Sequence, residues 1–195
     1  MNFTPVDWNS WERAEVFRHF IRDLRCVMSL TVEVDITDFL RAVKGRGLAF
    51  YPAMIWVAST AVNRRAELRM GWDSGGNPGI WDVVSPYYAQ FHREDSRFAK
   101  LVTEYDPDFS VFYERFQEDQ VRFASCRGFD QRELPPNTFD LTFPKVLHHS
   151  SLTIGLVICP GANAPGALAR KPRRRRGTAP AAIFASPGPS GPAGN

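Results

Sequence analysis

The sequence predicts an α/β or α+β domain whose sheet, mostly antiparallel or mixed, is covered by helices. Two observations carry this prediction. Segments with an apolar period of three to four residues occur along the same chain as β-prone segments with a period of two, and one strand is followed by helices and then by a hairpin. At 195 residues, of which 44% are hydrophobic, the chain is long enough for one domain with a substantial core. We therefore expect one compact domain.

The first two elements are a helix and a strand. Residues 10–24, "SWERAEVFRHFIRDL", place apolar side chains at steps of three and four, which predicts a helix with Ser10 as its N-cap. Residues 28–36, "MSLTVEVDI", alternate apolar and polar side chains and are β-rich. This alternation predicts a half-buried strand.

Two helices are expected next. Residues 37–47, "TDFLRAVKGRG", predict a short helix with Thr37 as its N-cap. The following stretch at 51–62, "YPAMIWVASTAV", is apolar on more than one face, and Pro52 suits a first helical turn. Because it is far shorter than the roughly 18 residues that a membrane span needs, it predicts a buried core helix.

A hairpin and a long helix complete the regular part of the chain. The turn-forming "DSGGNPG" at 73–79 separates two β-prone runs, which predicts a hairpin followed by a further strand that ends at His92. Residues 106–123, "DPDFSVFYERFQEDQVRF", predict an amphipathic helix with Asp106 as its cap and Pro107 in its first turn.

The composition changes after Thr142. All 21 acidic residues precede residue 141, whereas residues 141–195 contain 7 Lys and Arg and no acid. Residues 160–195 are largely Ala, Pro, Gly and Arg, a composition that cannot build a core, and we expect a disordered tail there. Residues 143–159 are a divergent segment whose structure the sequence does not define.

The cysteines are three in number and widely spaced, at Cys26, Cys126 and Cys159, without a CxxC pair. This pattern favours neither a disulfide framework nor a zinc site, so we expect no metal site and a reducing, cytoplasmic location. The chain does not open with a basic segment followed by an apolar run, and no signal peptide is expected.

Six stretches in the first 142 residues, in order and at similar spacing, resemble the trimeric chloramphenicol O-acetyltransferase family: "WERAEVF" (11–17), "LTVEVDIT" (30–37), "FYPAMIWVA" (50–58), "ELRM" (67–70), "IWDVVSP" (80–86) and "FH" (91–92). The resemblance implies a two-layer sandwich, here truncated, with residues 1–142 as a partial domain. It also implies acetyl transfer from acetyl-CoA to a hydroxyl of chloramphenicol, in a homotrimer with sites between subunits.

The resemblance assigns roles to particular residues. The second His of the family motif HHxxxDG is the general base, and the Asp of that motif pairs with an arginine that corresponds to Arg13. The residues that correspond to the wall of the antibiotic pocket are Phe20, Leu24, Cys26, Met28 and Phe98. Without the family, Phe20 and Leu24 are better explained as a helical core face, and Tyr51 suits either the pocket or simple packing.

The oxyanion-hole hydroxyl of the family corresponds to Thr142, which follows "TFDL" at 138–141. An ordinary strand threonine is the alternative, and we prefer it because strands are rich in Thr.

The histidine pair His148–His149 does not satisfy the motif. From His148 the sequence runs "HHSSLTI", with Thr153 and Ile154 where the family has Asp and Gly. No acid follows Asp140 to orient a base. We therefore do not assign His149 as the catalytic base, and we expect His19 and His92 to be structural or exposed.

The basic run "RKPRRRR" at 170–176 could contact nucleic acid, but it lacks interleaved aromatic residues and a recognisable binding fold. We expect a solvated charge run instead. One hypothesis explains the acid-free composition and the missing motif together: the reading frame of a GC-rich gene shifts near residue 142 or 143. The chain is then an acetyltransferase-family protein without its catalytic third, and an inert remnant or a basic-tailed nucleic-acid binder is the alternative.

Overall fold

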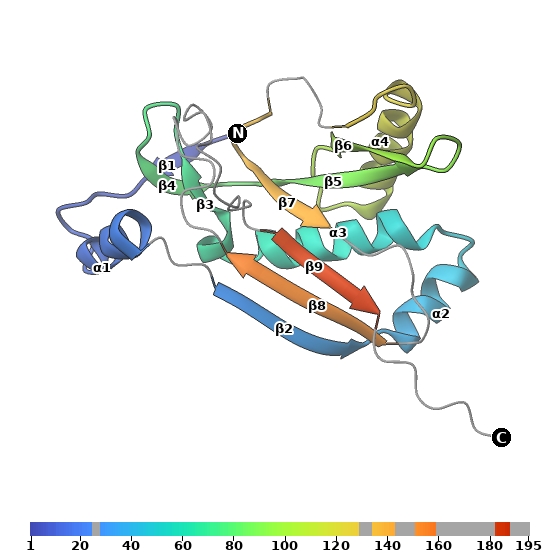
Figure 1. Cartoon of the computed structure of the whole chain (residues 1–195), viewed down its shortest axis with the longest axis horizontal. Helices are drawn as coiled ribbons and strands as arrows, with labels where there is room; N and C mark the ends of the chain where they lie inside the picture. Colours follow the sequence, from blue (N-terminus) through green and yellow to red (C-terminus); the bar gives the residue numbers. More distant parts are fainter. Residues whose placement is uncertain (25–27, 129–133, 143–150, 159–181, 188–195) are drawn as a thin grey trace.

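The computed structural model describes residues 1–24, 28–128, 134–142, 151–158 and 182–187. Helices and strands are interspersed along the chain (Figure 1). The strands are β1 (Phe3–Pro5), β2 (Met28–Asp35), β3 (Met70–Trp72), β4 (Pro78–Trp81), β5 (Ser85–His92), β6 (Arg97–Val102), β7 (Thr138–Thr142), β8 (Ser151–Ile158) and β9 (Ala182–Pro187). The helices are α1 (Ala14–Arg18), the π-helix η1 (His19–Leu24), α2 (Thr37–Gly45), α3 (Phe50–Asn63), the 3-10 helix η2 (Ala66–Arg69) and α4 (Phe109–Arg122).

The strands form two sheets. A small antiparallel sheet has the order β1-β4-β3, and a six-stranded sheet has the order β2-β8-β9-β7-β5-β6. In the larger sheet β7 is parallel to both β5 and β9, and the other pairs are antiparallel. The expected mixed sheet covered by helices is therefore confirmed.

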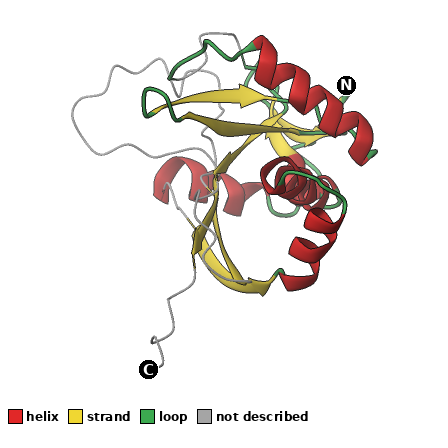
Figure 2. Ribbon diagram, turned by 90° about the vertical axis from the view of Figure 1, so that its right-hand side faces the viewer, coloured by secondary structure: helices red, strands yellow, loops and turns green. Residues whose placement is uncertain are grey.

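The core lies between the larger sheet and helices α3 and α4. Figure 2 shows the sheet bent so that α3, seen nearly end-on, lies on its inner side. The fully or almost fully buried residues of this cluster come from five elements: Ile55, Tyr88, Ala99, Leu101, Phe112, Phe116 and Leu141. Burial of α3 on several sides confirms the expected core helix, and Pro52 lies buried in its first turn. None of the described helices is both long and apolar enough to cross a bilayer.

Three of the expected helix starts are wrong. Ser10 does not cap the first helix: its hydroxyl donates to Asp7, and α1 begins only at Ala14. Thr37 is the first residue of α2, and the side chain of Asp35 accepts hydrogen bonds from both its backbone N–H and its hydroxyl. Ser10 fails because the N-cap position of α1 is occupied by Arg13. At the start of α2 the Asp35 carboxylate, a stronger acceptor than a hydroxyl, accepts the bonds.

The cap of α4 is Asp108 rather than Asp106, because the Asp108 carboxylate accepts the Ser110 N–H at 2.7 Å. The first predicted helix is also not continuous: α1 has five residues and passes into the π-helix η1. Strand β6, which follows the expected strand end at His92, was not predicted.

Strand β9 lies in the segment for which the sequence predicts a disordered tail. Residues Ala182–Pro187 pair with β7 on one side and with β8 on the other. The physical reason is that a short stretch without an internal proline can satisfy its backbone N–H and C=O groups from two neighbouring strands, whatever the composition around it. The rest of residues 160–195 lies outside the described residues.

Candidate functional site

Arg13 lies immediately before α1 and is exposed. Its carbonyl accepts the Phe17 N–H at 2.9 Å, so its backbone belongs to the first helical turn. Among the residues that the structure describes, no carboxylate lies within ion-pair distance of its guanidinium. Arg13 is therefore accessible. The Asp partner that the resemblance implies for it is not among the residues that the structure describes.

The candidate pocket residues of the N-terminal region lie on η1 and at the start of β2. Phe20 and Leu24 are 40% and 57% exposed, so they are not the buried core face that helical spacing alone suggests. Met28 is the first residue of β2, where its backbone pairs with Ile158. Cys26 lies outside the described residues.

Phe98 stands on β6 directly opposite Phe91 on β5. The two rings are 43% and 46% exposed. On β6, Ala99 and Leu101 point into the core, so alternation along this strand places Phe98 on the other face of the sheet. Two exposed aromatic rings side by side are an apolar surface suited to an aromatic ligand or another subunit.

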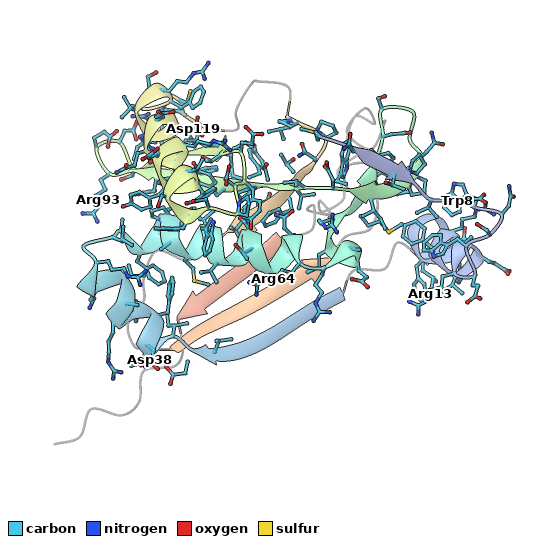
Figure 3. All side chains as sticks on the ribbon, turned by 180° about the vertical axis from the view of Figure 1, so that it is seen from behind. Trp8, Arg13, Asp38, Arg64, Arg93 and Asp119 are labelled. Atoms are coloured by element: carbon cyan, nitrogen blue, oxygen red, sulfur yellow. The ribbon has the colours of Figure 1, made fainter. Side chains whose placement is uncertain are left out.

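These candidate residues are not assembled into one site within a single chain. Figure 3 labels Arg13, at the α1 end of the molecule, and Arg93, in the turn between β5 and β6, at the opposite end. Phe20 and Leu24 belong to the first end, whereas Phe98, next to that turn, belongs to the second. A pocket that contains all three side chains therefore needs more than one copy of the chain.

Thr142 is the last residue of β7, and its backbone pairs with Phe184 of β9. Strand β7 lies inside the larger sheet between β5 and β9, so the position of residue 142 is fixed by neighbours on both sides. This central position agrees with the strand threonine that we preferred and does not test the role of its hydroxyl.

A buried ion pair connects β7 with β6. Lys100 on β6 pairs with Asp140 on β7, and the Lys100 ammonium lies 4.4 Å from the centre of the Tyr87 ring. The pKa of Lys100 is lowered, because burial disfavours its charged form. The hydrogen bond from Lys100 to Asp140 and the negative charge of Asp140 raise this pKa and offset part of the effect. Sequence reasoning missed this pair, although a single charged residue within each of the short segments "FAKLV" and "TFDLT" was a signal for it.

Tyr51 packs against the core cluster. Its hydroxyl donates to the Ala89 carbonyl, and its ring makes edge contacts with Tyr88 and Phe116. Burial, followed by the nearby Tyr88 and Asp140, raises the pKa of its phenol. Of the two roles considered for Tyr51, these contacts are those of packing.

The two described histidines have local carboxylate partners. His19 is exposed and its Nδ1 lies 2.9 Å from Asp23, one helical turn away. His92 is buried at the end of β5 and its Nδ1 lies 3.3 Å from Glu94. Both environments are those of structural or surface histidines. His148 and His149 lie outside the described residues.

Metal-binding side chains do not converge in the described part of the chain: it has no group of three or more His, Cys, Asp or Glu that could hold an ion.

Comparison with known proteins links this arrangement to one family. The family model for chloramphenicol acetyltransferase matches residues 1–154. The chain is 34% identical over 143 residues to a chloramphenicol acetyltransferase of Clostridium butyricum, covering 73% of this chain and 65% of that one. It is 37% identical over 139 residues to one of Streptomyces acrimycini, covering 71% and 63% respectively.

A solved chloramphenicol acetyltransferase superimposes with a TM-score of 0.62 at 19% identity, over 76% of this chain and 72% of that one, which shows the shared fold. In sequence, the chain spans only about 65% of the length of the Clostridium butyricum relative.

Proposed function

This chain belongs to the chloramphenicol acetyltransferase family, and we propose that it derives from an acetyl-CoA-dependent O-acetyltransferase but does not itself transfer the acetyl group. The proposal concerns the 195-residue chain. Its sequence retains residues that correspond to the family's acceptor pocket. It lacks the HHxxxDG motif, which in the family carries the general base.

One observation carries the proposal: HHxxxDG does not occur in the 195 residues. The only adjacent histidines, His148 and His149, are followed by Thr153 and Ile154 at the Asp and Gly positions. Arg13, which would pair with the motif's Asp, meets no carboxylate among the described side chains. The missing motif therefore removes the base and also the partner of the arginine.

The chemistry of the family shows why this loss matters. An alcohol oxygen of the acceptor attacks the thioester carbon of acetyl-CoA, a base removes the alcohol proton, and the tetrahedral oxyanion collapses to the acetyl ester and the thiol of CoA. A neutral alcohol is a weak nucleophile, and a positioned base contributes about 10²–10⁴-fold to such a step. Without it, bound substrates would react only slowly.

The acceptor pocket is proposed to lie between subunits. Phe20 and Leu24 on η1 and Phe98 on β6 are exposed and lie at opposite ends of one chain. Two copies placed with η1 of one against β6 of the other would bring these side chains together around a flat aromatic acceptor such as chloramphenicol. This arrangement supports the family's homotrimer as the ancestral state. The location that we propose for the protein is the cytoplasm, because acetyl-CoA is present there.

A thiol-release assay with acetyl-CoA and chloramphenicol tests the proposal. We expect the rate of the 195-residue chain to equal the rate without protein. The matched control is a variant with His148 and His149 both changed to Ala, which should give the same background. Turnover comparable to that of an intact relative, and its loss in this control variant, would show that the pair is catalytic and the proposal wrong.

A further inference from the structure

The turn between β5 and β6 is held by Arg127, a residue that follows α4. This turn covers residues 93–96 and begins at Arg93, which Figure 3 labels. The Arg127 guanidinium donates from Nε to the Asp95 carboxylate at 2.6 Å and from Nη2 to the Glu94 carboxylate at 2.8 Å. The hydrogen bond from Arg127 also lowers the pKa of the Asp95 carboxyl. One planar guanidinium therefore fixes two consecutive carboxylates of the turn.

The same guanidinium is anchored to the segment after α4. Its Nη1 atom donates to the backbone carbonyls of Ala124 and Cys126, at 2.9 and 2.8 Å. The Arg127 side chain is 24% exposed. Because the donors of a guanidinium have a fixed planar geometry, these two bonds also set the direction in which its other nitrogens point. Arg127 thus joins the β5–β6 turn to the end of α4.

The backbone of the turn depends on such contacts. Ser96 has a φ of 56°, in the left-handed region that residues other than glycine rarely adopt. A residue in this region persists where the surrounding structure over-determines its conformation. The neighbouring Asp95 carboxylate accepts the Arg97 N–H at 3.1 Å as well as the hydrogen bond from Arg127. Removing Arg127 would therefore take away one of the contacts that hold the turn in this conformation.

The segment that carries Arg127 also pairs with the outer edge of β6. Gly128 donates its N–H to the Phe98 carbonyl, and the Gly128 carbonyl accepts the Lys100 N–H at 3.0 Å. These two bonds form a parallel bridge between Gly128 and Ala99. Since β6 is the last strand of the larger sheet, the bridge pairs an edge that the described strands leave open.

This backbone geometry sets how Phe91 and Phe98 face each other. Phe98 turns its carbonyl to Gly128 and so away from β5, which makes Phe91 and Phe98 a non-hydrogen-bonded pair. In such a pair the side chains stand closest, with Cα atoms about 4.5 Å apart. A shift of β6 or of its turn would separate the two rings.

We propose that Arg127 is a positioning residue for the acceptor surface: it holds the β5–β6 turn and the edge of β6 so that Phe91 and Phe98 present one continuous aromatic surface to a flat aromatic acceptor. Phe91 is thereby a second residue of that surface. The ion pairs of Arg127 are partly exposed, and such pairs contribute little to the stability of a whole domain. The inference rests on the proposed function only for the kind of acceptor.

Equilibrium dialysis of the 195-residue chain with chloramphenicol tests the proposal without any acetyl transfer. Arg127→Ala should raise the dissociation constant about two- to tenfold, the range that the geometry of an aromatic contact is worth. Arg127→Lys keeps the charge but replaces the planar fork by a compact ammonium, and it should bind with intermediate affinity. The matched control is Arg122→Ala, which removes the same charge from the exposed end of α4 and should bind like the parent.

Hydrogen exchange gives a second readout that needs no ligand. The Lys100 amide, which donates to Gly128, should exchange several times faster in Arg127→Ala. The Leu101 amide, which faces β5, should keep its protection. Unchanged exchange at Lys100 would show that Arg127 does not hold this edge and would overturn the proposal.

Three binding results would also overturn it: parent-like affinity of Arg127→Ala, equal weakening by Arg122→Ala, or a parent chain that does not bind chloramphenicol. If Arg127→Ala does not fold, Arg127→Lys decides in the same way, because it retains the charge, and parent-like affinity then counts against the proposal. Acetyl transfer by the parent chain would instead contradict the proposed function and leave the binding result standing.

Discussion

The ammonium group of Lys100, on β6, forms an ion pair with the carboxylate of Asp140, on β7, across the intervening strand β5. Both side chains are largely buried, and the Lys100 ammonium also lies 3.4 Å from the Tyr87 carbonyl of β5. The pair thus ties three neighbouring strands together on the face opposite the core. It also fixes the strand that ends at Thr142, the last residue of the region that resembles the family closely.

Removing one partner of this ion pair should destabilise the protein strongly. Asp140→Ala leaves the Lys100 ammonium buried without a counter-charge, and such a loss typically costs about 3–5 kcal/mol. The double variant Lys100→Met with Asp140→Leu leaves no charge behind and should recover most of this loss. Urea unfolding followed by tryptophan fluorescence measures both. A single variant within about 0.5 kcal/mol of the parent would show that the pair contributes little.

Tyr51 should make the protein less stable at high pH. The folded state raises the pKa of its phenol because the ring is buried, whereas in the unfolded chain the phenol titrates near its ordinary value of 10.0. The raised pKa means that stability is fully present below the unfolded value and is lost as pH rises above it. Unfolding midpoints measured at rising pH should fall above pH ~10.

The control for this effect is Tyr51→Phe, which keeps the ring and removes the ionisable group. It should lose about 1 kcal/mol at neutral pH, from the hydrogen bond to the Ala89 carbonyl. Its stability should then decline less above the ordinary tyrosine pKa than that of the parent. Parallel declines of the two proteins would contradict the assignment.

The cap of α4 should be sensitive to the side chain at residue 108. Asp108→Ala removes the acceptor of the Ser110 N–H and should cost about 1 kcal/mol. Asp108→Asn retains an acceptor oxygen and should cost much less, which makes it the matched control. Thermal unfolding by circular dichroism measures both, and equal losses in the two variants would rule out a capping role.

The encoding DNA should contain the missing motif in another frame. We expect translation downstream of the codon for residue 142 to give HHxxxDG and acidic residues in one of the two alternative frames. Their presence would explain the acid-free composition of residues 141–195 as an out-of-frame product. Their absence from both frames would remove the frameshift hypothesis and leave sequence divergence.

Local sequence patterns predicted most elements but not their ends. The alternation at 28–36, the apolar run at 51–62 and the turn at 73–79 correspond to β2, α3 and the β3–β4 hairpin. These signals are local, so a single segment carries them. The caps were placed wrongly because several oxygen-bearing side chains compete within a few residues, as Asp106 and Asp108 do before α4.

Long-range pairings could not be predicted in the same way. Strand β7 is parallel to both β5 and β9, which lie far from it in sequence, and no periodicity within "TFDLT" specifies those partners. The Lys100–Asp140 pair exists only because β6 and β7 both flank β5. For the candidate site, the family resemblance pointed to Phe20, Leu24 and Phe98, whereas their exposure and their placement at opposite ends required the structure.

The central claim is that the defect lies only in the sequence after residue 142, and one chimera tests it most directly. Residues 1–142 would be joined to the C-terminal third of the Clostridium butyricum relative, the region where the family resemblance implies HHxxxDG, and assayed for thiol release beside the 195-residue chain. The account predicts that the chimera acetylates chloramphenicol at least about 10²-fold faster than the parent chain, the lower bound for a restored base. A folded, inactive chimera, or an active parent chain, would contradict it.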